Sequence, residues 1–118
     1  MSLASAAAEN AALNGLDGTG STNVIPYTGL HTASPGTTGA NESASTTRQA
    51  TSWNAASGGT KTNSNSLTFT TPGTTACTHF STWSASTAGT YAIGGALASS
   101  VTAVTITVAA GALSIAAS

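Results

Sequence analysis

Hydrophobic and polar side chains alternate along much of the chain after residue 23, with the period of two that is typical of β-strands. The clearest alternation lies at residues 104–108, where Val104, Ile106 and Val108 share one face and two threonines share the other. Clusters of Pro, Gly and Asn between such segments indicate turns. The pattern predicts seven short strands, at residues 24–32, 46–53, 66–71, 76–83, 90–97, 104–108 and 113–115.

Two of these strands contain residues that disturb a regular ladder. Pro26 has no N–H donor, so we expect an edge or a bulge at that end of the first strand. Gly94 and Gly95 predict a kink in the strand at 90–97. Short strands at about ten-residue spacing, with threonines on the solvent side, are typical of all-β domains. We therefore predict a single antiparallel β-sandwich, jelly-roll-like in form, with a short N-terminal helix.

The helix is predicted at residues 2–13. Ser2 can act as its N-cap, alanine favours helix, and Leu3 and Leu13 lie on a helical spacing. Gly15 and Gly18 end it. So short a helix is marginal by itself, and we expect it to lie on a surface. The predicted organisation is one domain over residues 1–118, with a helical arm at 1–16 and the sandwich at 24–118.

The composition also indicates that the hydrophobic core is small. Hydrophobic residues make up 40 % of the chain, but most of them are alanine, which buries little area. Cys77 is the only cysteine, so no disulfide within the chain can compensate. Oligomerisation or docking onto a larger assembly is therefore the expected source of further stability.

Charge excludes several classes of partner. Only 4 % of residues are charged and the net charge is −1, which leaves no basic patch for nucleic acid or for anionic lipid. No apolar run is long enough to span a membrane, and the N-terminus lacks the positive flank of a secretory signal. Many nearly neutral copies can lie close together without repulsion, which favours a repeated structural subunit.

Candidate chemistry is sparse. No Gly-x-Ser-x-Gly motif is present, the three carboxylates are far apart in sequence, and Gly36-Thr37-Thr38-Gly39 lacks the lysine of a phosphate-binding loop. Cys77 and His79 could form half of a metal site, but two semi-buried strand residues are the better interpretation. We predict no enzyme activity, no cofactor and no metal.

The segment from Leu30 to Arg48 carries two of the five charged residues. Its Pro and Gly residues predict tight turns. We expect Glu42 and Arg48 to pair, with His31 nearby, and to hold this loop against the sandwich. The hypothesis is that one partner of the pair is desolvated; the alternative is an exposed pair worth about 0–1 kcal/mol.

The same segment carries a resemblance to a known family. The chain resembles small virion structural proteins of tailed phages, especially phages of actinobacteria, which are called minor capsid, head decoration or tail fibre proteins. The matching stretches are residues 30–42, 48–50, 53–59, 78–85, 94–97 and 109–115. Residues 43–47 depart from the family's glycine and aromatic pattern, which leaves the conformation before Arg48 open. The resemblance implies no catalytic residues.

Together, these observations predict a capsid decoration protein that is made in the host cytoplasm and binds the outer surface of the assembled shell. Its expected partners are the major capsid protein and copies of itself. Either the N-terminal helix or the loop would make the contacts, and the candidate residues are Leu3, Leu13, Pro35, Thr37 and Thr38.

Two alternatives stay open. The first is a tail-tip or tail-fibre module. The second is a carbohydrate- or receptor-binding sandwich with aromatic stacking platforms, for which the candidates are Trp53, Trp83, Tyr27 and Tyr91. Core packing is the favoured interpretation of these aromatic side chains, because few other large residues could fill the core.

Overall fold

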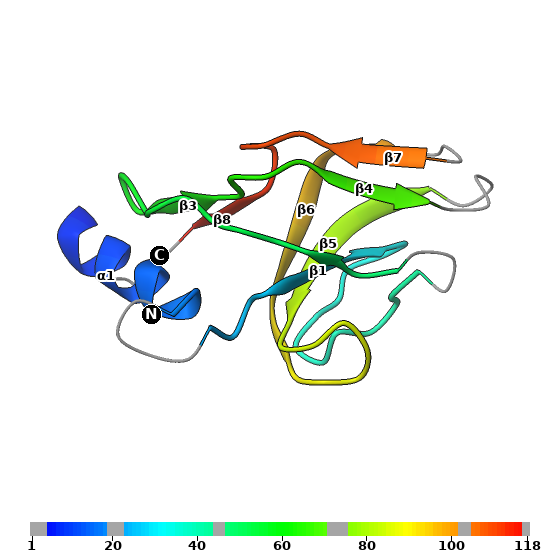
Figure 1. The fold of residues 1–118 in the computed structure, drawn as a ribbon, viewed down its shortest axis with the longest axis horizontal. Helices are drawn as coiled ribbons and strands as arrows, with labels where there is room; N and C mark the ends of the chain where they lie inside the picture. Colours follow the sequence, from blue (N-terminus) through cyan, green and yellow to red (C-terminus); the bar gives the residue numbers. More distant parts are fainter. Residues whose placement is uncertain (1–4, 19–22, 44–46, 71–75, 102–104, 117–118) are drawn as a thin grey trace.

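The computed structural model describes residues 5–18, 23–43, 47–70, 76–101 and 105–116, apart from the side chains of residues 98 and 99. One helix precedes a series of strands that pair antiparallel (Figure 1). The elements are α1 (Ala6–Leu16), β1 (Tyr27–His31), β2 (Gln49–Ala50), β3 (Thr60–Thr62), β4 (Leu67–Thr70), β5 (Cys77–Trp83), β6 (Tyr91–Val101), β7 (Thr105–Val108) and β8 (Ser114–Ala116). The coarser part of the predicted fold is confirmed: the described chain is mostly β with a helix at its N-terminal end, and its strands form several small antiparallel sheets.

The largest sheet has four strands in the order β2-β1-β5-β6. β1 lies inside this sheet, and four of its five residues are buried. Pro26 directly precedes β1, so its missing N–H removes no bond from the ladder. Leu30 of β1 lies opposite Phe80 of β5, and both side chains are at most 1 % exposed. This pair forms the centre of the core on that sheet.

The remaining strands form two short ladders, β3 with β8 and β4 with β7. Both ladders join the same two stretches of chain, but their registers differ by one residue: Thr62 faces Ser114, whereas Leu67 faces Val108. Asn63 fills the break. Its side chain donates to the carbonyls of Asn65 (2.8 Å) and Ala109 (3.1 Å) and accepts from the Leu113 N–H (2.9 Å). The two ladders are thus one interrupted pairing, joined by a fully buried amide.

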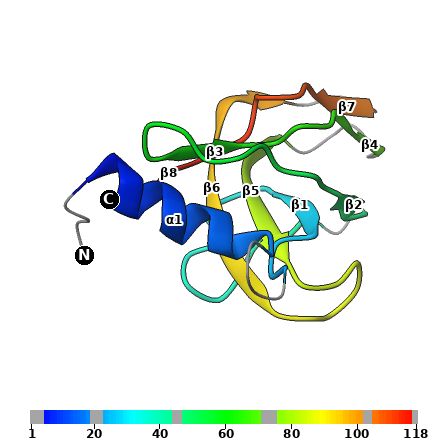
Figure 2. The same cartoon turned by 60° about the vertical axis from the view of Figure 1, so that its left-hand side comes forward.

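Helix α1 lies beside β3 (Figure 2). Its N-cap is Ser5, whose side chain accepts from the N–H of Ala8 (3.3 Å); the predicted cap Ser2 lies outside the described residues. Leu13 is 3 % exposed and belongs to the core. Asn10 and Asn14 accept backbone N–H groups of the turn before β3, at 2.8 Å each. The alanine-rich helix therefore has the supporting surface that its short length requires.

Two strand predictions need correction, and one strand was not predicted. In the predicted strand at 46–53 only Gln49–Ala50 is a strand; residue 46 lies outside the described residues, and Trp53 forms an isolated bridge with Asn63. β3 was not predicted, because its Thr-Lys-Thr sequence has no hydrophobic residue to mark a buried face. The stretch from 90 to 97 is part of a longer strand, β6, which continues to Val101.

β6 continues through Gly94 and Gly95, and its register with β5 shifts between the Ser81–Gly94 and Trp83–Tyr91 pairs, directly beside the glycines. Gly94 and Gly95 also leave space for neighbours: a Cβ on Gly95 would lie 2.9 Å from the Phe80 ring, and a Cβ on Gly94 would collide with Pro35. The absence of a side chain therefore lets the 32–41 loop and the core pack closely against the sheet. The arrangement of the strands as a two-sheet jelly-roll, and the division into an arm and one sandwich domain, stay predictions.

Candidate functional site

Glu42 is placed at the end of the loop that follows β1. The chain returns there to pair with β1, and Glu42 forms a β-bridge with His31. The Ser43 N–H donates to the Leu30 carbonyl at 2.9 Å. These two backbone contacts therefore fix the position of the Glu42 main chain. Its side chain keeps 29 % of its surface exposed.

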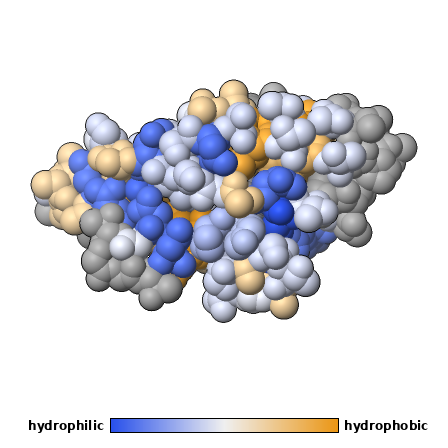
Figure 3. All heavy atoms as spheres, in the orientation of Figure 1, coloured by the Kyte–Doolittle hydropathy of each residue, from blue (hydrophilic) through white to orange (hydrophobic). Residues whose placement is uncertain are grey.

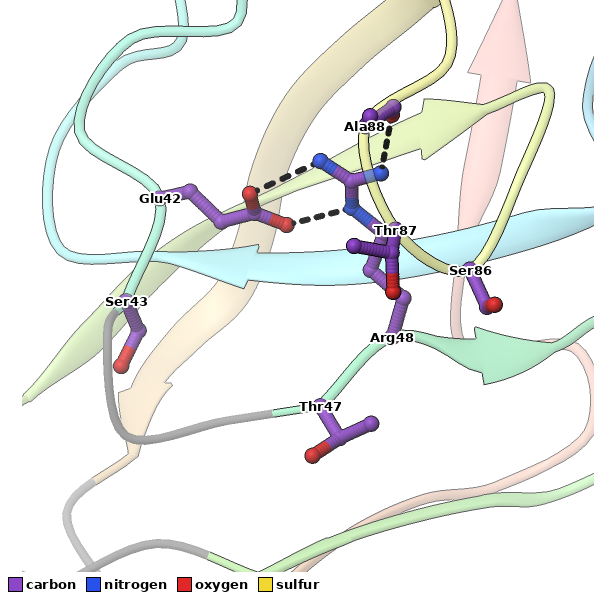
Figure 4. A pocket seen from close by; sticks show the side chains of 7 residues that line it. All are labelled: Glu42, Ser43, Thr47, Arg48, Ser86, Thr87 and Ala88. Atoms are coloured by element: carbon purple, nitrogen blue, oxygen red, sulfur yellow. Dashed lines mark hydrogen bonds and ion pairs between the residues drawn. The ribbon is translucent and has the colours of Figure 1, made fainter.

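Arg48 faces Glu42 from the segment just before β2 (Figure 4). Its Nε and Nη2 donate to the two carboxylate oxygens of Glu42, at 2.7 and 3.0 Å. Its Nη1 donates to the carbonyls of Ala85 (3.1 Å) and Ala88 (2.6 Å) in the β5–β6 connection. The Arg48 side chain is 9 % exposed. The structure thus brings Glu42 and Arg48 together, with the arginine as the desolvated partner, and the pair joins three separate segments.

The guanidinium also lies on the indole ring of Trp83, with Cζ 3.7 Å from the ring centroid. A chain of hydrogen bonds runs from this ring to His31. Trp83 Nε1 donates to Ser81 Oγ (2.6 Å), which lies 2.6 Å from His31 Nε2, and His31 Nδ1 lies 2.8 Å from the Ala40 carbonyl. A carbonyl can only accept, so Nδ1 carries the proton and Nε2 of the neutral ring accepts from Ser81. This arrangement accommodates the neutral ring, in which Nδ1 donates to Ala40 and Nε2 accepts from Ser81.

This geometry predicts a pH dependence. Burial lowers the pKa of His31 below its ordinary value, against the opposing effects of the Ala40 carbonyl and the Glu42 carboxylate. The folded chain therefore takes up this proton less readily than the unfolded chain. Its contribution to stability is complete above the ordinary histidine pKa of about 6.5 and is lost as pH falls below that value. We expect the Tm to decrease as the pH is lowered from about 7.5 to about 5.

Melting curves and an NMR titration of the imidazole check this expectation. His79→Gln changes the other histidine, whose charge also lowers the pKa of His31, so this variant should keep the decrease in Tm but with a smaller size. A His31 ring that titrates above about 6.5 would contradict the prediction.

Replacing Arg48 with methionine tests the ion pair. We expect a loss of about 1–2 kcal/mol in the free energy of unfolding, because Glu42 and two carbonyls lose their donor while water can still reach the carboxylate. Urea unfolding measures it. Gln49→Met changes the next polar side chain and should cost less than about 0.5 kcal/mol. Equal stability of Arg48→Met and the unsubstituted chain would rule out an energetic role for the pair.

A pocket of about 360 Å³ opens above the ion pair. The two charged side chains line it together with polar and small residues of the same three segments, namely Ser43, Thr47, Ser86, Thr87 and Ala88 (Figure 4). Ser43 is buried, whereas the Thr47, Ser86 and Thr87 side chains are exposed. The β5–β6 connection carries no signal in the sequence, because its Ser and Thr residues resemble those in the rest of the chain.

The other candidate residues are spread over the molecule. Leu3 lies outside the described residues. Leu13 and Pro35 are buried within the chain, so neither side chain offers a contact surface for a partner. Thr37 and Thr38 are exposed at the tip of the 32–41 loop.

The aromatic residues that were candidates for sugar stacking lie mostly in the interior. Trp53 and Trp83 are each 9 % exposed, and Tyr27 and Tyr91 are half-buried. Trp83 packs against Tyr91 with ring centroids 5.4 Å apart. Burial leaves neither tryptophan a free face for stacking on a sugar ring.

Cys77 is buried in β5, and burial raises the pKa of its thiol. Within the described residues, no three His, Cys, Asp or Glu side chains gather closely enough to hold a metal ion. No helix among those residues has the length and hydropathy needed to cross a bilayer.

A second ion pair, between Lys61 and Asp17, has no signal in the sequence. Lys61 of β3 is 1 % exposed, and its Nζ lies 3.2 Å from Asp17 Oδ1 at the end of α1. The same Nζ donates to Asn14 Oδ1 (3.0 Å) and to the Asn54 carbonyl (2.8 Å). Three acceptors match the three N–H donors of the ammonium group. Asp17 and Lys61 are 44 residues apart in sequence, so no local sequence pattern indicates that they pair.

A second, apolar pocket of about 250 Å³ lies between β6 and β7. Its lining includes Leu97, Val101, Ile106, Val108 and Ala112, and we call it the β6–β7 groove. In Figure 3 hydrophobic atoms reach the surface near β4 and β7.

Comparison with known proteins gives the chain its family. The chain matches no curated protein. A family model described as podophage GP4 fiber I protein gp80 matches residues 3–116. This match spans nearly the whole chain, from before α1 to the end of β8. The chain belongs to the podophage GP4 fiber I protein gp80 family, a family of non-enzymatic tail-fibre proteins of the phage virion.

Proposed function

We propose that the chain is a building module of the tail fibre, and that copies of it contact one another along the fibre. The observation that carries this proposal is the family match over residues 3–116. It favours the fibre alternative over the capsid decoration protein that the sequence predicted. In a fibre, the module supplies a fixed shape and a surface for neighbouring modules.

The distribution of charge supports contact between copies. Four of the five charged residues form two ion pairs within the chain, Glu42 with Arg48 and Asp17 with Lys61. Their charges cancel over short distances, so two copies can approach with little repulsion. The β6–β7 groove offers the apolar surface that such a contact can bury. We assign this groove to a second copy of the chain.

Light scattering of the purified chain tests the contact between copies. Ala112 is exposed and lines the groove, so Ala112→Asp should shift an oligomer towards monomer by placing an unpaired charge in the interface. Ala110→Asp, an equally exposed change outside the lining, should leave the oligomer intact. A chain that is monomeric without substitution, or an Ala112→Asp variant that stays oligomeric, contradicts the assigned contact.

Virions that lack this protein test the fibre assignment. We expect image reconstruction to show a normal capsid and missing fibre density, and supplying the protein in trans should restore the fibre density. Quantitative mass spectrometry of complete virions should give a copy number that fits a few fibres. Loss of density over the capsid surface, with hundreds of copies per virion, would instead support the capsid decoration protein.

A further inference from the structure

The pocket above Glu42 and Arg48 has a combination of features that the ion pair alone does not require. A clamp between three segments needs only the guanidinium, the carboxylate and the two carbonyls that bind it. The structure adds a hollow of about 360 Å³ over the pair. This volume is at the lower end of the range for small-ligand sites, which is about 300–1,000 Å³.

The charges in the pocket restrict the class of ligand. Glu42 and Arg48 bind each other through two hydrogen bonds, so the lining carries no net charge. A charged ligand would lose its hydration without gaining a counter-ion. The ligand that fits is therefore neutral.

The polar groups restrict the class further. Each oxygen of the Glu42 carboxylate accepts one bond from Arg48, and a carboxylate oxygen can accept two. Because this side chain is 29 % exposed, the remaining acceptor positions can be reached from solvent. Exposed hydroxyls of Thr47, Ser86 and Thr87 can both donate and accept. Figure 4 shows Glu42 on one side of the guanidinium and Ser86 and Thr87 on the other. Such a lining matches a molecule with several hydroxyl groups.

The floor of the pocket is held in place before any ligand binds. Arg48 makes four hydrogen bonds and lies on the Trp83 ring. The Trp83 indole is itself held by Ser81. A ligand therefore orders few protein side chains when it binds, which lowers the entropic cost.

We propose that this pocket binds a neutral saccharide unit of one or two rings through Glu42 and the hydroxyls of the β5–β6 connection. The site differs from an aromatic stacking platform, because Trp83 lies beneath Arg48 and most of the side chains that line the pocket are polar. With hydrogen bonds alone in an open pocket, the Kd of one site is on the order of millimolar. Several copies in one assembly raise the overall avidity.

The test uses the 118-residue chain labelled with ¹⁵N and titrated with single sugars. The probes are glucose, galactose, mannose, rhamnose, N-acetylglucosamine and lactose, with glucuronate as an acidic sugar and glycerol as a small polyol. We expect at least one neutral sugar to shift the amide signals of Glu42, Arg48 and residues 86–88 in a saturable manner. Failure of every neutral sugar, or tighter binding of glucuronate or equal binding of glycerol, overturns the proposal.

Variants distinguish this site from nonspecific sugar contact. Thr87→Val removes an exposed hydroxyl from the lining at nearly constant volume. It should weaken binding and raise the Kd on the order of 5-fold. Thr90→Val makes the same change at an exposed position of the same connection outside the lining, and it should leave the Kd unchanged. Equal affinity of both variants would overturn the assignment to this pocket. The proposal does not rest on the fibre assignment, which is tested separately on virions.

Discussion

Replacing Asp17 with asparagine is expected to lower the free energy of unfolding by about 3 kcal/mol, although the change affects one atom of the side chain. Asp17 is the charged partner of Lys61, whose side chain is 1 % exposed. Once that partner is neutral, the ammonium group keeps two neutral acceptors but has no counter-ion. Water cannot reach it without opening the contact between α1 and β3. An uncompensated buried charge is among the most destabilising features in a folded protein.

Chemical unfolding with a double-mutant cycle measures this effect. In a Lys61→Met background no ammonium group remains, so Asp17→Asn should then cost less than about 1 kcal/mol. Glu9→Gln removes a carboxylate from the same helix and serves as the matched control, with an expected cost below about 1 kcal/mol. If Asp17→Asn costs the same in both backgrounds, Lys61 is not held by the pair.

Gly39→Ala is expected to lower the free energy of unfolding by about 2–4 kcal/mol. Gly39 has a φ of +77°, in the left-handed region that disfavours a side chain. A Cβ at this position would also lie 2.7 Å from Cη2 of Trp83. The indole cannot move away easily, because Arg48 lies on it and Ser81 accepts from its Nε1. The backbone strain and the steric clash with Trp83 therefore both lower the free energy of unfolding.

Gly36→Ala separates the two causes. Gly36 lies in the same loop with a φ of +60°, but a Cβ there would have no neighbour within 4 Å. Its substitution should cost about 1 kcal/mol, which is the backbone strain alone. Thermal and urea unfolding of both variants give the comparison. Equal losses for the two variants would show that the loop does not press on Trp83 in solution.

Much of the strand content could be predicted from the sequence. Leu67 and Phe69 of β4, and Ile106 and Val108 of β7, alternate with threonines, and each of these four side chains is buried in the structure. The period of two therefore indicated both the strands and their buried faces. β3 was missed for the same physical reason, because the residue it buries is Lys61 and a lysine gives no hydrophobic signal.

The candidate site could be predicted in part. Glu42 and Arg48 have opposite charges and are six residues apart, so their pairing could be anticipated from the local sequence. The roles of Ala85 and Ala88 could not be anticipated, because they contribute backbone carbonyls that any residue could supply. Asn63 likewise stands among other polar residues in sequence, and only the offset between the two ladders gives its amide a function.

The sequence by itself determined that this protein is mostly β with an N-terminal helix, that it carries very few charges, and that a turn-rich segment follows Leu30, with Glu42 and Arg48 close enough in sequence to pair. These properties depend on periodicity, composition and neighbouring residues. The tertiary structure decided which polar groups are buried. Asp17 shows the difference: a carboxylate at the C-terminal end of a helix is locally unfavourable, and the buried Lys61, 44 residues away, gives it a stabilising role. Such pairs form only where folding brings distant segments together, because desolvation makes each buried charge depend on its partner.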